Sequence, residues 1–117
     1  MKTTRKKPDT LDVASLVMRE VNRRGGSCEI LELREAVTRQ VAPSWTWRRS
    51  FTHTYDWAIV ILTDLGELER VDSADGGSRV VCYRLASDWD PRRDSMRRSR
   101  REARLAHYVE RDRKNWD

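Results

Sequence analysis

The segment at residues 47–65 most constrains the fold, because its apolar side chains recur at helical spacing. Successive members are four, four, three, four and three residues apart, which places all of them on one side of an α-helix. The β-branched run at 57–62, taken alone, is also typical of a buried strand. The stripe extends well before that run, and a glycine follows it, so we predict one helix. The stripe consists of Trp47, Phe51, Tyr55, Ala58, Leu62 and Leu65.

Two shorter helices are predicted before this segment. Asp9 or Thr10 is suited to cap the first, and the glycine pair at 25–26 ends it. The second carries an apolar stripe from Leu33 onward. It ends before Pro43, because the residue preceding a proline disfavours helical backbone angles.

The remaining elements are a hairpin and a polar helix. Residues 27–30 form a turn or a brief strand, whereas 67–71 and 79–85 are predicted as two strands. The turn between them, at 72–78, contains Asp-Gly-Gly, which adopts positive φ at little cost. From Pro91 to about Asn115 the composition is typical of a polar helix whose first turn accepts the proline.

Charge is distributed unevenly along the chain, whose net charge is +5. Residues 91–117 carry ten Arg or Lys against five Asp or Glu, and residues 1–9 carry four basic groups against one acidic group. The middle of the chain, residues 10–90, is mildly acidic. Basic ends on such a core favour electrostatic arms for a polyanion, and solvated tails without a partner are the alternative.

The sequence has neither a membrane segment nor the residue groups that catalysis needs. No apolar stretch reaches the ~18 residues of a membrane span, and the basic start lacks the apolar part of a secretory signal, so we expect a cytoplasmic protein. Metal ligands of the usual kind are few and unpaired in spacing, and no phosphate-cradling glycine loop occurs. We therefore expect no enzymatic activity, no metal and no cofactor. The residues considered were Cys28, Cys82, His53 and His107.

The order helix, short strand, helix, helix and hairpin resembles the winged helix-turn-helix family of DNA-binding domains. The likeness covers residues 10–85 and is carried by Glu-Leu-Arg-Glu-Ala-Val at 32–37 and Leu-Thr-Asp-Leu-Gly-Glu-Leu at 62–68. It implies an α+β winged helix, with a three-helix core, a β-hairpin wing and an additional basic C-terminal helix. The implied regions are a flexible basic N-terminal arm at 1–9, a winged-helix domain at 10–86, and a linker with the C-terminal helix at 87–117.

In this family the third helix enters the major groove, and its N-terminal half reaches the base edges. The resemblance therefore implies base contacts from the side opposite the apolar stripe. Arginine can bind guanine through two hydrogen bonds, and threonine can bind base edges or phosphate. A solvated helix face is the competing interpretation. The side chains in question are Arg48, Arg49, Thr52 and His53, with Asp56 beside them as a group that repels phosphate or orients an arginine.

Phosphate contacts are expected from the wing and the two tails. An ordinary hairpin turn, and ion pairs within the C-terminal helix, are the competing interpretations. The wing residues are Ser78 and Arg79, those of the N-terminal arm are Lys6 and Lys7, and a basic ridge on the C-terminal helix would comprise Arg93, Arg97, Arg100 and Arg104.

Some apolar residues need a cover that the three-helix core does not supply. Trp57, Val60 and Ile61 leave the main stripe of the third helix. The C-terminal helix or a second subunit would cover them, and homodimerisation through that helix is one possibility. A thin apolar stripe on it comprises Met96, Ala103, Ala106, Val109 and Trp116.

These observations favour a DNA-binding transcriptional regulator, of a small bacterial or phage type, with double-stranded DNA as its partner. Two alternatives stay open because fold does not fix function. One is a protein-interaction module within a nucleoprotein complex, and the other is an RNA-associated basic protein. Cys28 and Cys82 would lie on neighbouring strands as two reduced thiols or, less simply, as a redox switch.

Overall fold

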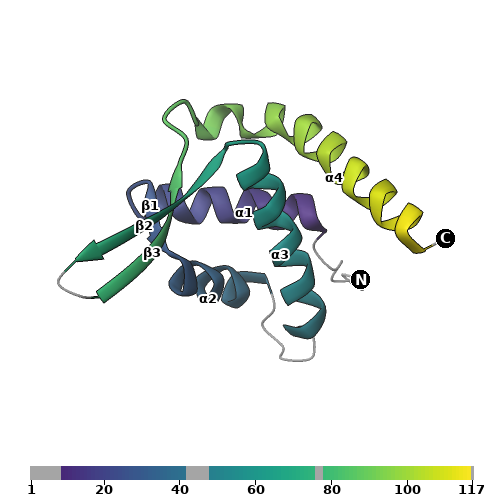
Figure 1. Cartoon of the computed structure of the whole chain (residues 1–117). Coiled ribbons are helices and arrows are strands. Elements are labelled where there is room, and N and C mark those ends of the chain that lie inside the picture. The colour runs from purple at the N-terminus through teal and green to yellow at the C-terminus, as the bar shows by residue number, and fades with distance from the viewer. Residues whose placement is uncertain (1–8, 42–47, 76–77, 117) are drawn as a thin grey trace, which may run out of the picture.

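The computed structural model describes residues 9–41, 48–75 and 78–116, while the side chains at 42–52, 73–79 and 112–117 lie outside the described part. Within these residues the chain has four α-helices and one three-stranded antiparallel sheet (Figure 1). The predicted α+β class is confirmed at this level. No helix in the described part is long and apolar enough to cross a membrane.

Helix α1 (Thr10–Arg23) begins with a capping box. The Asp9 carboxylate accepts a hydrogen bond from the Asp12 amide at 2.8 Å, and the Asp12 carboxylate accepts one from the Asp9 amide at 3.3 Å. These bonds satisfy amides that have no partner inside the helix. At the other end Gly26, at φ +97°, donates its amide to the Val21 carbonyl at 2.9 Å. The predicted cap and stop are both confirmed.

Strand β1 (Ser27–Glu29) leads directly into helix α2 (Ile30–Val41). The Glu29 carboxylate accepts a hydrogen bond from the Glu32 amide at 2.8 Å, and so caps the helix that follows it. Of the two alternatives predicted for 27–30, a turn or a brief strand, the strand is present at three residues, and Ile30 already belongs to α2.

Helix α3 (Arg48–Asp64) runs without interruption through 57–62, so the helical prediction for that run is confirmed. Tyr55, Ala58 and Leu62 are buried, as their spacing predicts. Burying a side chain such as Leu62 contributes about 1.5–3 kcal/mol, which outweighs the weak strand propensity of a β-branched run. Gly66, at φ +74°, ends the helix.

The hairpin is longer than predicted. Strands β2 (Leu68–Asp75) and β3 (Ser78–Leu85) pair from Leu68↔Leu85 to Asp75↔Ser78, and β3 lies between β1 and β2. The prediction of a turn over 72–78 was therefore wrong for 72–75. Those residues pair with β3 in a hairpin that projects from the body (Figure 1).

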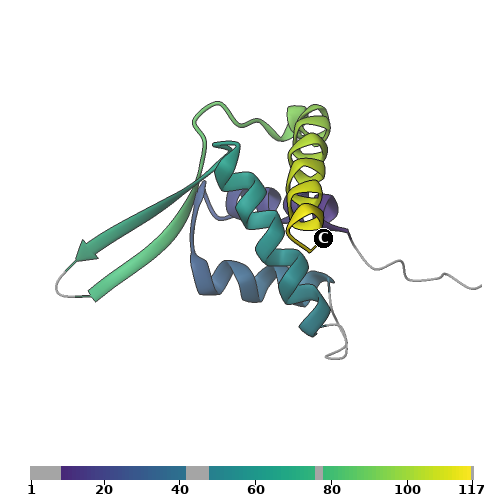
Figure 2. The same cartoon turned by 45° about the vertical axis from the view of Figure 1, so that its right-hand side comes forward.

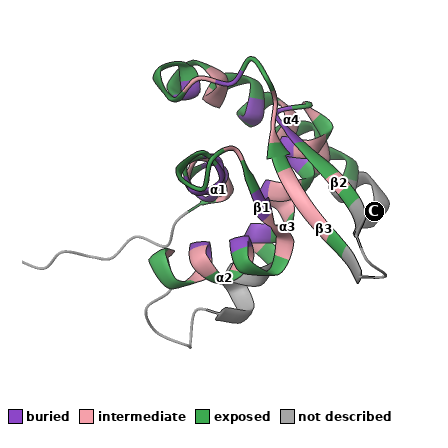
Figure 3. Ribbon diagram, turned by 90° about the vertical axis from the view of Figure 1, so that its left-hand side faces the viewer, coloured by how far each residue is buried: buried purple, intermediate pink, exposed green. Residues whose placement is uncertain are grey.

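The core lies where α1, α2 and α3 face one another, and Leu68 and Cys28 join it from the sheet. Figure 3 shows the buried residues on these facing sides, with intermediate and exposed residues along the hairpin. The apolar residues of α1 that reach this core are Val13, Ala14, Val17, Met18 and Val21.

A single 3₁₀ turn η2 (Pro91–Arg93) precedes helix α4 (Asp94–Trp116). The predicted helix from Pro91 is thus split into this turn and α4. Asp90 caps the turn by accepting a hydrogen bond from the Arg92 amide at 2.9 Å. Helix α4 lies against α1 and α3, on the side of α3 away from the hairpin (Figure 2).

Candidate nucleic-acid interface

The outward side of α3 is the surface on which the sequence places base contacts. It stands between the hairpin and α4 in Figure 2. His53, Asp56 and Val60, at intervals of three and four residues, are exposed on this side. The expected contacts Arg48, Arg49 and Thr52 belong to the first turns of α3, with side chains outside the described residues.

His53 is tied to its own helix one turn further on. The Trp57 indole Nε1 donates a hydrogen bond to His53 Nε2 at 3.1 Å, and the two rings stand at 83°. An acceptor Nε2 requires a neutral ring with its proton on Nδ1. The ring donor of His53 is then its Nδ1–H.

Helix α4 covers part of the apolar surplus of α3, through Trp57, whereas Val60 remains 42% exposed. The Trp57 and Tyr108 rings are 5.5 Å apart between centroids, and Ile61 is fully buried. A hydrogen bond to Asp64 raises the pKa of Tyr108, and Arg104 pairs with the same carboxylate at 3.2 Å. Asp64 is thus turned toward α4.

The apolar stripe expected on α4 is not its docking face. Met96 is 74% exposed and Val109 55% exposed, while Ala103 and Ala106 are also exposed. Trp116 lies outside the residues whose side chains are described. The face that meets the body is instead largely charged.

The four arginines of the expected basic ridge divide into two that form ion pairs and two that do not. Arg97 contacts Glu67 and Asp88, both at 3.4 Å, and Arg104 contacts Asp64. Arg93 and Arg100 are exposed and form no ion pair with any described residue. The carboxylate partners of Arg97 and Arg104 come from other segments, rather than from neighbouring turns of α4.

On the hairpin, the described charges pair with one another across or along the strands. Arg84 meets Glu69 at 2.6 Å, and Arg70 lies 3.7 Å from Asp72. Ser78 and Arg79 start β3, and their side chains lie outside the description. Lys6 and Lys7 also lie outside the described residues, so the expected phosphate contacts of the arm stay predictions.

Sequence reasoning missed a buried ionic cluster at the base of α4. Arg101 is 0% exposed and binds Glu67 at 2.9 and 3.1 Å and Asp94 at 2.7 Å. Asp94 also accepts a hydrogen bond from the Trp89 indole at 3.4 Å. Burial alone raises the pKa of Asp94, but the hydrogen bond and charge of Arg101 outweigh it and lower that pKa. The only sequence signal was the spacing of Asp94 and Arg101, two turns apart on one helix face.

A buried carboxylate outside this cluster joins the ends of α1 and α2. Glu20 is 2% exposed and accepts hydrogen bonds from Arg23 at 2.6 Å, Arg24 at 2.8 Å and Gln40 at 2.8 Å. The hydrogen bond from Arg23 lowers the pKa of Glu20, against the opposing effect of burial. This group is structural, since its oxygens are occupied.

The two cysteines are neighbours on paired strands but belong to opposite faces of the sheet. Cys28 pairs with Tyr83, and Cys82 pairs with Glu29, so the two thiols point apart. Burial raises the pKa of the Cys28 thiol. Both thiols are free, and the opposed directions disfavour the redox switch. Across the described ranges no group of three potential ligands is placed to hold a metal.

No protein-family model matches the chain, and no match was found among curated proteins or solved structures.

Proposed function

We propose that the chain is a winged-helix protein that binds double-stranded DNA, with α3 as the reading helix and the β2–β3 hairpin as the wing. The observation that carries the proposal is the placement of α3. One side is buried by α1 and α2, while His53 and Asp56 stand exposed on the other side. A helix presented in this way is suited to the major groove.

Charge along α3 favours base reading by its N-terminal half. Asp56 at the middle of the helix and Asp64 at its C-terminal end repel phosphate, although α4 already engages Asp64 through Arg104. The first turn instead carries Arg48 and Arg49. The expected base contacts therefore lie in the half of α3 that would enter the groove first. They are Arg48, Arg49, Thr52 and His53.

Phosphate binding is assigned to cations that the protein itself does not neutralise. Arg100 and Arg93 meet this condition on the C-terminal segment. The N-terminal arm, which lies outside the described residues, is assigned the same role from its sequence. Arg97 and Arg104 are assigned a structural role, because carboxylates of the body hold them.

Selection of duplexes from a random pool by the full chain, followed by gel shifts, tests the proposal. We expect Arg49→Ala to cost about 1–3 kcal/mol at the selected site and to relax one base position. Arg100→Ala should weaken all duplexes alike and reduce the salt slope by about one. Arg39→Ala is the matched control, since Arg39 lies on the exposed side of α2 and pairs only with Glu35.

Two outcomes of the selection and gel shifts would contradict the proposed reading helix. If the pool yields no preferred duplex, or if Arg49→Ala and Arg39→Ala bind equally well, α3 is not a reading helix. Binding that is sequence-independent and follows salt alone would assign the basic tails a nonspecific role.

A protein-interaction module is the second candidate, and one observation favours it. Leu31 is 67% exposed and Val60 42% exposed, on the facing helices α2 and α3. Exposed apolar side chains that gather on one surface are typical of protein contacts. In that case Leu31→Glu with Val60→Glu would abolish assembly with the partner, whereas Arg49→Ala would leave it unchanged.

A further inference from the structure

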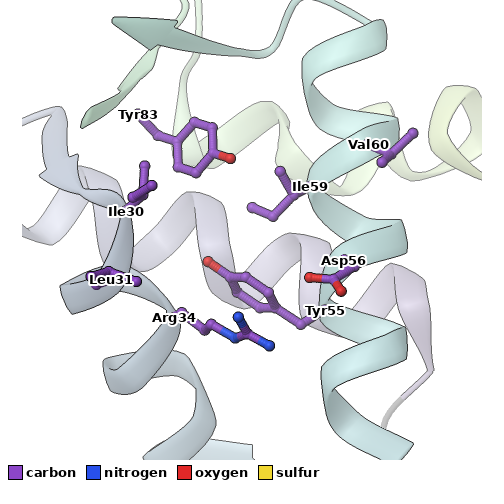
Figure 4. Close-up of a pocket in the computed structure, with 8 residues that line it drawn as sticks. All are labelled: Ile30, Leu31, Arg34, Tyr55, Asp56, Ile59, Val60 and Tyr83. Carbon is purple, nitrogen blue, oxygen red and sulfur yellow. The ribbon is translucent and has the colours of Figure 1, made fainter. Parts of the chain in front are cut away.

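A cavity of about 320 Å³ opens between α2, α3 and β3 (Figure 4). Ile30 from α2, Ile59 from α3 and Tyr83 from β3 form its apolar end. The volume lies at the lower limit of ligand pockets, which favours a molecule smaller than a typical drug. Three separate elements build the walls, so the cavity is a product of the fold.

The other end of the cavity carries one positive and one negative group. Arg34 enters from α2 and Asp56 from α3, and both lie toward the same end in Figure 4. No ion pair joins them, and neither pairs with another described residue. The Arg34 guanidinium lies over the Tyr55 ring, 5.9 Å from its centroid, which orients it without neutralising it.

A cation and an anion that face one cavity without pairing can receive both charges of a zwitterion. A simple carboxylic acid would satisfy Arg34 but leave its charge beside Asp56. A simple amine would satisfy Asp56 but face Arg34. Apolar side chains at the opposite end add a requirement for a large hydrophobic group.

We propose that this cavity binds a free amino acid with a large apolar side chain. Arg34 holds the carboxylate through charge-assisted hydrogen bonds, and Asp56 accepts hydrogen bonds from the ammonium group. The side chain of the ligand lies among Ile30, Ile59 and Tyr83.

A titration followed by amide chemical shifts tests the proposal with four defined probes. L-Phenylalanine carries both charges and a ring, 3-phenylpropanoate lacks the ammonium, 2-phenylethylamine lacks the carboxylate, and L-alanine lacks the ring. We expect saturable shifts at Arg34, Ile59 and Val60 with L-phenylalanine at millimolar concentration. Each single-charge analogue should bind about tenfold more weakly or worse, and L-alanine should cause no saturable shift.

Variants identify the two charged contacts. Arg34→Gln and Asp56→Asn should each weaken L-phenylalanine about tenfold, while Arg39→Gln on α2 and Asp72→Asn on β2 should bind like the unmodified chain. Arg34 and Asp56 take no part in the ion pairs of the body, and a thermal melt of each variant verifies folding.

Three results would overturn the proposal. They are equal binding of all three aromatic probes, absence of any saturable shift, and shifts of the same amides that follow protein concentration alone. The last would mean that a second copy of the chain covers the cavity. No DNA is present in the titration, so its result is independent of the proposed function.

Discussion

Arg101, Glu67 and Asp94 are three ionisable side chains that share one buried position. Removing such groups from water costs several kcal/mol per charge, and their mutual attraction offsets that cost only with good geometry. The distances of 2.7–3.1 Å from Arg101 to the two carboxylates meet this condition. Ser15 on α1 lies 3.4 Å from the same guanidinium. We infer that these directional bonds fix the register in which α4 docks.

Arg101→Met should destabilise the protein by about 3–5 kcal/mol, because two buried carboxylates lose their cation. Urea unfolding at neutral pH measures this difference. Arg100→Met, one position away and exposed, should change the unfolding free energy by less than about 0.5 kcal/mol. A triple change of Glu67, Asp94 and Arg101 to apolar residues of similar volume should restore most of the loss. Equal effects of the two single variants would show that Arg101 is not buried.

Stability should fall in acid because of Glu20 and Asp94. Both pKa values are lower in the folded protein than their ordinary values of 4.5 and 3.8, so the unfolded chain binds protons first as the pH falls. The stabilisation is therefore complete above these ordinary values and is lost below them, as the pH passes through the folded pKa values. Urea unfolding between neutral pH and about pH 3 measures the slope.

Glu20→Gln isolates one of these groups. It should lower the plateau at neutral pH and flatten the acid slope, since the variant has no proton to gain at that position. Glu35→Gln is the control, because Glu35 forms an exposed pair with Arg39 on the same layer of the fold. An unchanged acid slope in Glu20→Gln would contradict the lowered pKa.

At the scale of elements, helix ends are specified locally and helix faces are specified by the core. The end of α3 shows the first point. Gly66 donates its amide to the Thr63 carbonyl at 3.1 Å, and Glu67 donates to the Leu62 carbonyl at 3.0 Å. This turn points the chain into β2 and carries Glu67 toward Arg101. The turn that ends α3 therefore positions the Glu67 carboxylate to bind Arg101 of α4.

Gly66→Ala should cost about 1 kcal/mol, because φ near +74° is strained for a residue with a Cβ atom. The cost is conformational, since no atom lies within 4 Å of the position that the added Cβ would take. Gly66→Asn should cost less, because asparagine tolerates the left-handed region. Thermal melts of the two variants compare their losses of stability. A larger loss for Gly66→Asn than for Gly66→Ala would contradict this backbone explanation.

At the scale of the whole molecule, α4 is anchored at its start and more lightly held later. Asp94 and Arg101 are buried, Arg104 and Tyr108 contact the side of α3, and Glu110 and Arg111 are exposed. The hairpin projects on the other side of the body (Figure 1). The principal extents of 49 × 35 × 32 Å reflect this elongation.

Hydrogen exchange should follow this gradient along α4. Amides of residues 97–104 should exchange slowly, and those of residues 109–111 should exchange faster, because the side chains at 109–111 are exposed. Molar salt should leave the slow set protected, since buried ion pairs are screened far less than exposed ones. Exchange measured by mass spectrometry at low and high salt checks both statements, and uniform exchange along α4 would contradict them.

The sequence alone determined the helix over 57–62, the capped start of α1 and the hairpin, because periodicity, caps and turns depend on residues a few positions apart. Only the tertiary structure decided which charges are buried. Arg101 and Glu67 are 34 positions apart, and the spacing from Asp94 is the one local feature that separates Arg101 from its exposed neighbour Arg100. The cavity between α2, α3 and β3 has the same origin, since its charges and apolar walls meet only when three elements pack together.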